Sequence, residues 1–183
     1  MLRCIAHVRW LCNDEYVIDL LVMRHAKSAW DTDAASDFDR PLADRGARDA
    51  RRMAAWLAEN DLEPDGVLSS SALRARMTVQ PVIDRFEISP TRVQFRDELY
   101  LADATSWIDA IADTVFWLPL LCGHNPGLDE LVSHLSSTPP PLSSNRKLMT
   151  TASIAHLHFE GWDEVENGSG QLVSLVRPRE LTR

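Results

Sequence analysis

Residues 20–28 read Leu-Leu-Val-Met-Arg-His-Ala-Lys-Ser, an uncharged run that changes abruptly to polar residues at Arg24 and His25. A short apolar run bounded by polar residues is typical of a strand buried on both faces of a parallel sheet. In open α/β sheets, ligands bind beside the carboxyl ends of such strands. We therefore expect a strand at residues 19–24, with His25 at the rim of a pocket and Arg24 beside it.

The pairing of His25 with Arg24 indicates phosphoryl transfer. A neutral imidazole is a competent nucleophile near pH 7, because its unperturbed pKa is about 6.5. A guanidinium group matches the geometry of phosphate oxygens. The pair thus predicts a histidine that accepts a phosphoryl group held by arginine.

The composition is that of one globular domain. The chain has 183 residues, of which 45% are hydrophobic and 25% are charged, so it is long enough for one substantial core. Its 19 Lys and Arg residues and 27 Asp and Glu residues give a formal net charge of −8. This charge argues against nucleic acid or an anionic membrane as a partner.

The cysteines and the hydropathy pattern favour a cytoplasmic protein. Cys4, Cys12 and Cys122 are widely spaced, which is typical of reduced thiols rather than of a disulfide framework. The sequence has neither an 18-residue apolar run nor a convincing signal peptide. Residues 1–17 are compatible with an extra strand, a mobile tail or translated sequence upstream of the natural start. We therefore divide the chain into an N-terminal extension at 1–17 and a single domain at 18–183.

Apolar periodicity and helix-start signals alternate along the rest of the chain. We expect helices at 44–60, from Ser71, from 103–105 and from Asn125, and further strands at 66–69, 93–95, 115–122, 151–159 and 171–177. Pro81 is expected to kink or interrupt the second helix, and Asn125 to cap the last one. Strands that alternate with helices predict an α/β class protein, a three-layer α/β/α sandwich with a mainly parallel central sheet.

Residues distant in the sequence are expected to meet at one edge of this sheet. Two predicted strands end in His25 and His124, and parallel neighbours would bring both rings to the same edge. Arg74 lies in the first turn of a helix that follows a strand, where the backbone amides favour phosphate. Lys27 and Ser28 follow His25 directly and are further candidates for phosphate contact.

Five segments in this order resemble the histidine phosphatase superfamily and, among its branches, the small SixA-type phosphohistidine phosphatases. The segments are residues 24–30, 37–46, 71–76, 98–100 and 123–128. The resemblance implies a phosphoglycerate mutase-like fold and a phosphatase that needs neither a metal nor another cofactor. It also implies that His25 becomes phosphorylated, while Arg24, Arg74 and His124 hold the phosphoryl group and the transition-state charge.

The resemblance places the general acid at Glu98, with Asp97 and Asp103 as rivals. A leaving imidazole needs a strong enzyme acid less than an alcohol does, because its nitrogen is itself basic, and His124 would then suffice. Mutase-like members carry Asn at the position of Asp31. A carboxylate there would repel the substrate, so we expect Asp31 to point elsewhere.

The expected substrate is a phosphorylated protein, for example a histidine-transfer domain that carries phosphohistidine. Little of the chain is left for the insertion that covers the pocket in larger relatives, so a protein substrate has access. The alternatives are a small phosphate ester, or a module that binds phosphorylated partners without turnover. A metal-dependent hydrolase would use His156 and His158, which share one strand face, but no third ligand stands at motif spacing.

Overall fold

The computed structural model describes residues 17–161, 165 and 168–181 of the chain, and the predicted N-terminal extension thus lies almost wholly outside the described residues. Within them, six strands form one sheet in the order β3-β2-β4-β1-β5-β6. Their bounds are β1 (Ile18–Arg24), β2 (Gly66–Ser70), β3 (Val93–Arg96), β4 (Pro119–Gly123), β5 (Ile154–Phe159) and β6 (Gln171–Val176).

The sheet is mainly parallel, as the sequence predicts. Strands β3, β2, β4 and β1 run in the same direction, whereas β5 is antiparallel to both β1 and β6. Leu20 and Val22 of β1 belong to the core on one face, and Leu21 and Met23 belong to the core on the other. This burial on both faces explains the uncharged run of β1.

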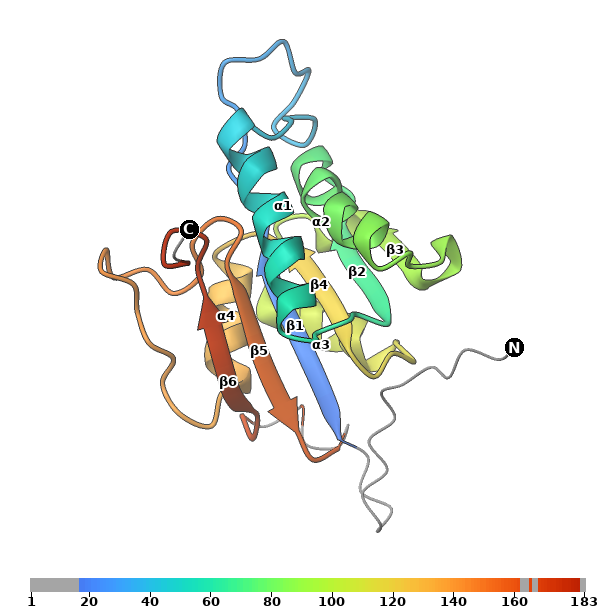
Figure 1. Ribbon diagram of the computed structural model, residues 1–183, viewed down its shortest axis with the longest axis vertical. Helices are drawn as coiled ribbons and strands as arrows, with labels where there is room; N and C mark the ends of the chain where they lie inside the picture. The colour runs from blue at the N-terminus through green and yellow to red at the C-terminus, as the bar shows by residue number, and fades with distance from the viewer. Residues whose placement is uncertain (1–16, 162–164, 166–167, 182–183) are drawn as a thin grey trace.

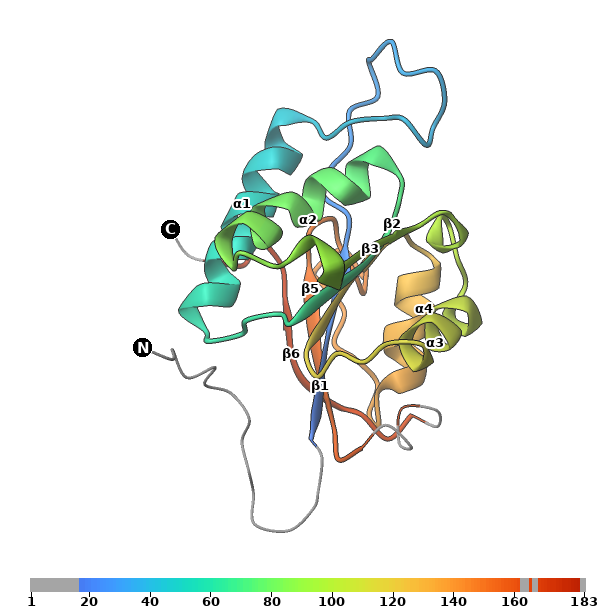
Figure 2. The same ribbon diagram turned by 90° about the vertical axis from the view of Figure 1, so that its right-hand side faces the viewer.

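Two helices cover each face of the sheet. Helices α1 (Asp44–Glu59) and α2 (Leu73–Arg85) lie on one side, and α3 (Ala104–Ala112) and α4 (Gly127–Leu135) on the other (Figures 1 and 2). Two short 3-10 helices, η1 (Pro90–Arg92) and η2 (Asp97–Leu99), flank β3. The predicted three-layer α/β/α sandwich is therefore confirmed. Among the described residues, every helix is too short or too polar to cross a bilayer.

The structure begins β4 later than the pattern predicted. Residues 115–118 precede the strand, and Val115 is 82% exposed. The carboxylate of Asp65 accepts hydrogen bonds from the backbone N–H groups of Trp117 and Leu118. Pro119 then opens the strand, because its nitrogen has no hydrogen to donate within the ladder.

Pro81 does not interrupt α2, which is one continuous helix. The predicted cap at Asn125 was wrong. Helix α4 begins at Gly127 with Pro126 as its cap, whereas the Asn125 side chain donates a hydrogen bond to the backbone oxygen of Met149, 3.2 Å away. Asn125 therefore holds the loop before β5 rather than the helix terminus.

The segment between β1 and α1 rises above the carboxyl ends of the parallel strands (Figure 1). It is fastened to α1 by a close backbone approach at Gly46. The N–H of Ala43 donates to the oxygen of Lys27 at 2.9 Å, and a Cβ atom on Gly46 would lie 2.1 Å from that same oxygen. Only glycine allows this contact, which keeps Lys27 and its neighbours beside the helix.

Candidate active site

The register between β1 and β4 brings the two histidines together. Arg24 pairs with Gly123 across the two strands, and the N–H of His25 donates to the Gly123 oxygen at 2.9 Å. His124 directly follows β4, and the centroids of the two imidazole rings lie 4.9 Å apart. Two residues that are far apart in the sequence thus share one edge of the sheet.

Arg74, in the first turn of α2, reaches the same place. Its side chain is 4% exposed, and its Nη2 donates to Nδ1 of His124 at 3.3 Å. Thr78, one turn later, accepts a hydrogen bond from the N–H of Ala26 and donates to the Arg74 oxygen. These bonds fix the start of α2 against the residue that follows His25.

The hydrogen bonds of His25 define which ring nitrogen is free. Its Nδ1 lies 2.8 Å from the backbone oxygen of Ala26, and because a carbonyl oxygen only accepts, Nδ1 carries the hydrogen. In the neutral ring Nε2 is therefore left with its lone pair. Burial first, and then the nearby guanidinium groups of Arg74 and Arg24, lower the pKa of His25 to about 4. His25 is thus a neutral base at physiological pH.

His124 has the opposite tautomer. Arg74 only donates, so Nδ1 of His124 accepts its hydrogen bond, and Nε2 donates to Oγ of Ser70 at 2.9 Å. Burial, the neighbouring His25 and Arg74 lower the pKa of His124 to about 3. In this arrangement His124 orients Arg74. His124 is only 2% exposed and does not itself line the cavity that His25 borders.

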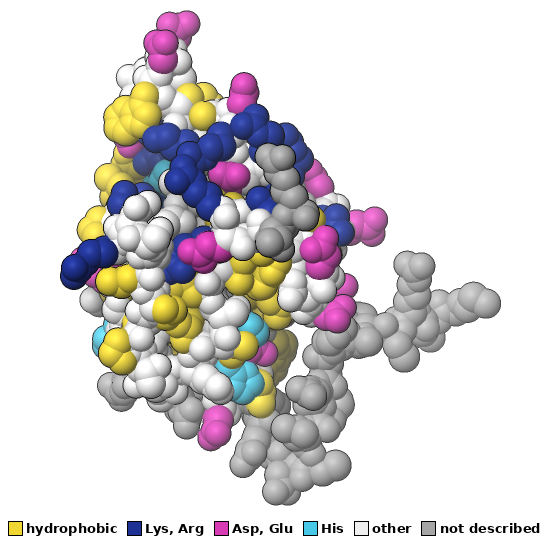
Figure 3. All heavy atoms as spheres, turned by 60° about the vertical axis from the view of Figure 1, so that its left-hand side comes forward, with side chains coloured by type: hydrophobic (Ala, Val, Ile, Leu, Met, Phe, Trp, Pro, Cys, Tyr) yellow, Lys and Arg dark blue, Asp and Glu magenta, His cyan; other side chains and the backbone are white. Residues whose placement is uncertain are grey.

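A cavity of about 200 Å³ opens in front of these residues. It is lined by Arg24, His25, Lys27, Ser28, Trp30, Asp37, Arg40, Arg74 and Thr151. Three arginines and a lysine thus surround one imidazole. The protein has a formal charge of −8, yet Lys and Arg side chains gather around the upper part of the face in Figure 3, at this edge of the sheet. Such a concentration of cations suits an anionic group.

The structure places five of the seven predicted site residues on the cavity wall: Arg24, His25, Lys27, Ser28 and Arg74. His124 lies directly behind it. Glu98 is exposed in η2 and does not line the cavity. The neighbouring Tyr100 does reach the site, because its hydroxyl donates to Oδ2 of Asp37 at 2.7 Å.

Four lining residues were not foreseen as site residues: Trp30, Asp37, Arg40 and Thr151. Two interactions hold Arg40 in place. Its Nη1 forms an ion pair with Oδ1 of Asp37 at 3.0 Å, and its Nη2 donates a hydrogen bond to Oγ of Ser28. The three-residue spacing of Asp37 and Arg40 was a signal for this ion pair, although the sequence gives no direction for either side chain.

Asp37 is the one carboxylate on the cavity wall. Its Oδ2 lies 3.0 Å from Nη2 of Arg74, and its oxygens also accept from Arg40 and Tyr100. The hydrogen bond from Tyr100 and the charges of the two arginines lower the pKa of Asp37, which is therefore ionised at neutral pH. Asp37 therefore occupies guanidinium donors of Arg40 and Arg74 that a phosphoryl group would also use. Asp31, which the sequence predicted to point away from the substrate, does not line the cavity.

Within the part of the chain that the structure describes, His156 and His158 do not belong to a metal site. Both rings bind the same carboxylate oxygen, Oδ1 of Asp19, at 2.7 and 2.9 Å. No group of three or more His, Cys, Asp or Glu side chains in the described residues is arranged to hold a metal ion.

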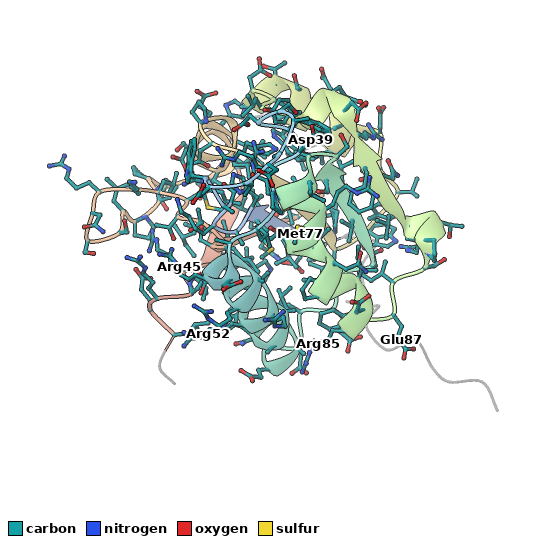
Figure 4. The ribbon with its side chains drawn as sticks, turned by 90° about the horizontal axis from the view of Figure 1, so that it is seen from above. Asp39, Arg45, Arg52, Met77, Arg85 and Glu87 are labelled. Atoms are coloured by element: carbon teal, nitrogen blue, oxygen red, sulfur yellow. The ribbon has the colours of Figure 1, made fainter. Side chains whose placement is uncertain are left out.

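A larger cavity of about 650 Å³ lies between α1 and α2. Met77 of α2 borders it on the side of α1 (Figure 4), and its sulfur accepts a hydrogen bond from the N–H of Leu42. Among the described residues that line this groove there is no histidine or cysteine. The volume of a cavity therefore does not distinguish the candidate site, whereas the cations around His25 make the smaller cavity the better candidate for binding an anion.

Comparison with known proteins agrees with this geometry. The sequence model of the histidine phosphatase superfamily (branch 1) matches residues 20–107. The phosphohistidine phosphatase SixA of Escherichia coli is 31% identical over 158 residues, which cover 83% of this chain and 90% of that protein. The chain belongs to the histidine phosphatase superfamily. It is an enzyme of the phosphatase type.

Other proteins are similar over nearly the whole chain. An uncharacterised protein of Mycobacterium tuberculosis is 37% identical over 166 residues, which cover 86% of this chain and all of that protein. A solved structure of the protein histidine phosphatase SixA in complex with tungstate aligns with a TM-score of 0.72 at 29% identity, covering 90% of this chain and all of that one. The phosphoglycerate mutase-like fold implied by the sequence is thus confirmed.

Proposed function

We propose that this histidine phosphatase removes the phosphoryl group from phosphohistidine on a protein, by way of a phosphohistidine intermediate on His25. The observation that carries the proposal is the state of His25. Its Nδ1 hydrogen is bonded to Ala26, its Nε2 lone pair is free, and it borders a cavity lined with Arg24, Arg40 and Arg74. A neutral nucleophile beside three guanidinium groups is what attack on a phosphoryl group requires.

The proposed first step is in-line attack by Nε2 of His25 on phosphorus. The new N–P bond forms as the bond from phosphorus to the substrate nitrogen breaks. The substrate imidazole leaves as a neutral ring when its other nitrogen is already protonated, so this step needs no dedicated enzyme acid. For leaving groups that are not basic, the sequence predicts Glu98 as the acid, but its exposed side chain does not line the cavity in this structure.

The proposed second step regenerates the enzyme. Water attacks the phosphorus of phosphorylated His25, the bond to Nε2 breaks, and orthophosphate leaves with the oxygen from water. Arg24 and Arg74 neutralise the negative charge on the phosphoryl oxygens in both steps. No step is assigned to a metal ion.

Trapping with a substrate labelled in the phosphoryl group tests the intermediate. The proposal expects one labelled residue, whose phosphate is lost in acid and is stable in alkali. Label that remains in a His25→Ala protein would refute the assignment of the nucleophile. A protein that binds the labelled substrate but never releases orthophosphate would instead be a binding module.

The substrate class is tested by turnover of a phosphorylated histidine-transfer domain against a panel of small phosphate esters. The proposal expects the higher kcat/KM for the phosphorylated domain, and a preference for one of the esters would make the protein a small-molecule phosphatase.

We also place the reaction in the cytoplasm, since Cys122 is a free buried thiol, as in proteins of reducing compartments.

A further inference from the structure

Trp30 is a large aromatic side chain that the fold leaves in solvent. It is 74% exposed, although it lies in the segment that connects β1 to α1 and lines the cavity in front of His25. Isolated exposed apolar residues are common and need no explanation. Trp30 differs from such residues because it borders the same small cavity as the nucleophile.

Two cations lie over the ring of Trp30. The guanidinium carbon of Arg40 lies 3.7 Å from the centre of the ring, and Nζ of Lys27 lies 6.0 Å from it. Arg40 is itself bonded to Asp37 and to Ser28, so the ring rests on a side chain that is already anchored. Because Trp30 is nevertheless 74% exposed, much of the ring stays accessible from solvent.

The leaving group of the proposed reaction shares this small cavity with Trp30. The phosphoryl group belongs between His25 and the cations of the cavity wall. In-line displacement places the leaving atom on the side of phosphorus opposite to Nε2 of His25. In a cavity of about 200 Å³ the group attached to that atom lies close to the lining residues, of which Trp30 has a large exposed aromatic ring.

We propose that Trp30 is a specificity-determining residue that stacks on the imidazole ring of the substrate phosphohistidine. This inference rests on the proposed function, since it concerns the leaving group of the same reaction. A planar ring gains from offset stacking on an indole, whereas an aliphatic leaving group presents no flat face to it. Trp30 therefore selects for phosphoryl groups attached to a ring, and Arg40 keeps the indole in the required position.

The experiment compares the wild type with Trp30→Ala and Trp30→Phe on two substrates, a phosphohistidine peptide and acetyl phosphate. Stacking of this kind is worth roughly 3- to 10-fold in affinity. We expect Trp30→Ala to raise KM for the phosphohistidine peptide by roughly that factor, with kcat and the KM for acetyl phosphate within about twofold of wild type. Trp30→Phe keeps a flat ring and is expected to restore most of the loss.

Two controls separate stacking from a merely structural role. Trp117 is 49% exposed and lies just before the amino end of β4, whereas the site lies at the carboxyl ends of the parallel strands. Trp117→Ala is expected to leave both KM values unchanged. Inhibition by orthophosphate reports on the cations, and it is expected to be the same in Trp30→Ala as in wild type. Weaker inhibition by orthophosphate together with equal KM increases for both substrates would overturn the proposal, because Trp30 would then only hold Arg40.

A phosphotyrosine peptide distinguishes the imidazole from other rings. A KM increase in Trp30→Ala for phosphotyrosine but not for phosphohistidine would overturn the assignment of the imidazole, as would unchanged KM values for every substrate. Failure of the proposed function looks different, because the wild-type protein would then form no phosphoenzyme with any of these substrates.

Discussion

One pair of histidines lies close to each end of β1, and the two pairs have opposite surroundings. At the carboxyl end, His25 and His124 lie among guanidinium groups, and burial with these charges lowers their pKa values to about 4 and 3. At the amino end, His156 and His158 of the neighbouring β5 both bind the carboxylate of Asp19. We call these the cationic pair and the carboxylate pair.

In each pair, the groups around the imidazole rings, rather than the imidazole itself, determine what the rings can do. In the cationic pair, Nε2 of His25 is left free beside groups that attract an anion. In the carboxylate pair, a nitrogen of each ring is already engaged by Asp19. The first arrangement suits attack on a phosphoryl group, as proposed above, whereas the second is a contact between two antiparallel strands.

Removal of one histidine from each pair gives the largest expected contrast. His25→Ala is expected to lower kcat by about 10⁵-fold or more, because the nucleophile is lost. His156→Ala, its matched control from the carboxylate pair, is expected to keep kcat within about twofold. Steady-state turnover of a phosphohistidine peptide measures both values, and comparable losses in the two variants would mean that the pairs are not functionally distinct.

A second comparison concerns the planar pair of N–H donors on the Arg74 guanidinium. Arg74→Lys keeps the positive charge but loses the planar pair of donors, and we expect a decrease in kcat/KM of roughly 10²-fold. Arg85→Lys, in the last turn of the same helix, serves as the control and should behave as wild type. Circular dichroism checks that both variants are folded. A kcat/KM for Arg74→Lys close to wild type would show that charge alone suffices.

The protonation of His25 is expected to follow pH differently from that of an ordinary histidine. Because its folded pKa is about 4, His25 should stay neutral as the pH falls from 7 to 5, whereas an ordinary histidine would gain its proton near pH 6.5. The stability that this neutral form contributes is lost as the pH falls from about 6.5 toward 4. NMR titration of labelled histidine, with His25→Ala for assignment, measures the midpoint. A midpoint near 6.5 would remove the argument for a buried neutral base.

Asp37 tests whether a carboxylate weakens the site for anions. In Asp37→Asn, one negative charge leaves the cavity wall, and we expect orthophosphate to inhibit roughly fivefold more strongly. Asp39→Asn is the control, since Asp39 lies in the same segment (Figure 4) and bonds to Ser36 rather than to the arginines. Weaker inhibition in Asp37→Asn would mean that Asp37 serves chiefly to position Arg40 and Arg74.

The smallest expected effect belongs to the carboxylate pair. Burial raises the pKa of Asp19, but the hydrogen bonds and charges of His156 and His158 outweigh this and lower it. Its contribution to stability is therefore present above the unfolded pKa of about 3.9 and is lost as the pH falls through the lower folded value. Asp19→Asn is expected to cost about 1–2 kcal/mol at pH 7 with unchanged kcat.

Urea unfolding at pH 7 and at pH 3 measures this effect. The difference between Asp19→Asn and wild type should shrink at the lower pH, because the wild-type carboxylate then begins to be protonated. A difference that grows toward low pH would contradict the assignment of the charge to Asp19.

Local patterns in the sequence were enough to predict the layers of this protein and the end of the sheet at which the candidate site lies. The uncharged run before Arg24 and the apolar stripes of the helices are local signals, since burial on one or both faces leaves a period in the sequence. The histidines after β1 and β4 could be placed at one edge because parallel strands end together. Their motif spacing also indicated the family before any geometry was known.

The contacts between side chains, by contrast, could not be predicted from the sequence. Asp37 meets Arg74 across 37 positions of sequence, and the segment that holds it has no repeating pattern from which a side-chain direction follows. The tautomers of His25 and His124 likewise depend on the partners Ala26, Arg74 and Ser70. Hydrogen-bond direction and burial set protonation, and both arise only when distant segments pack together.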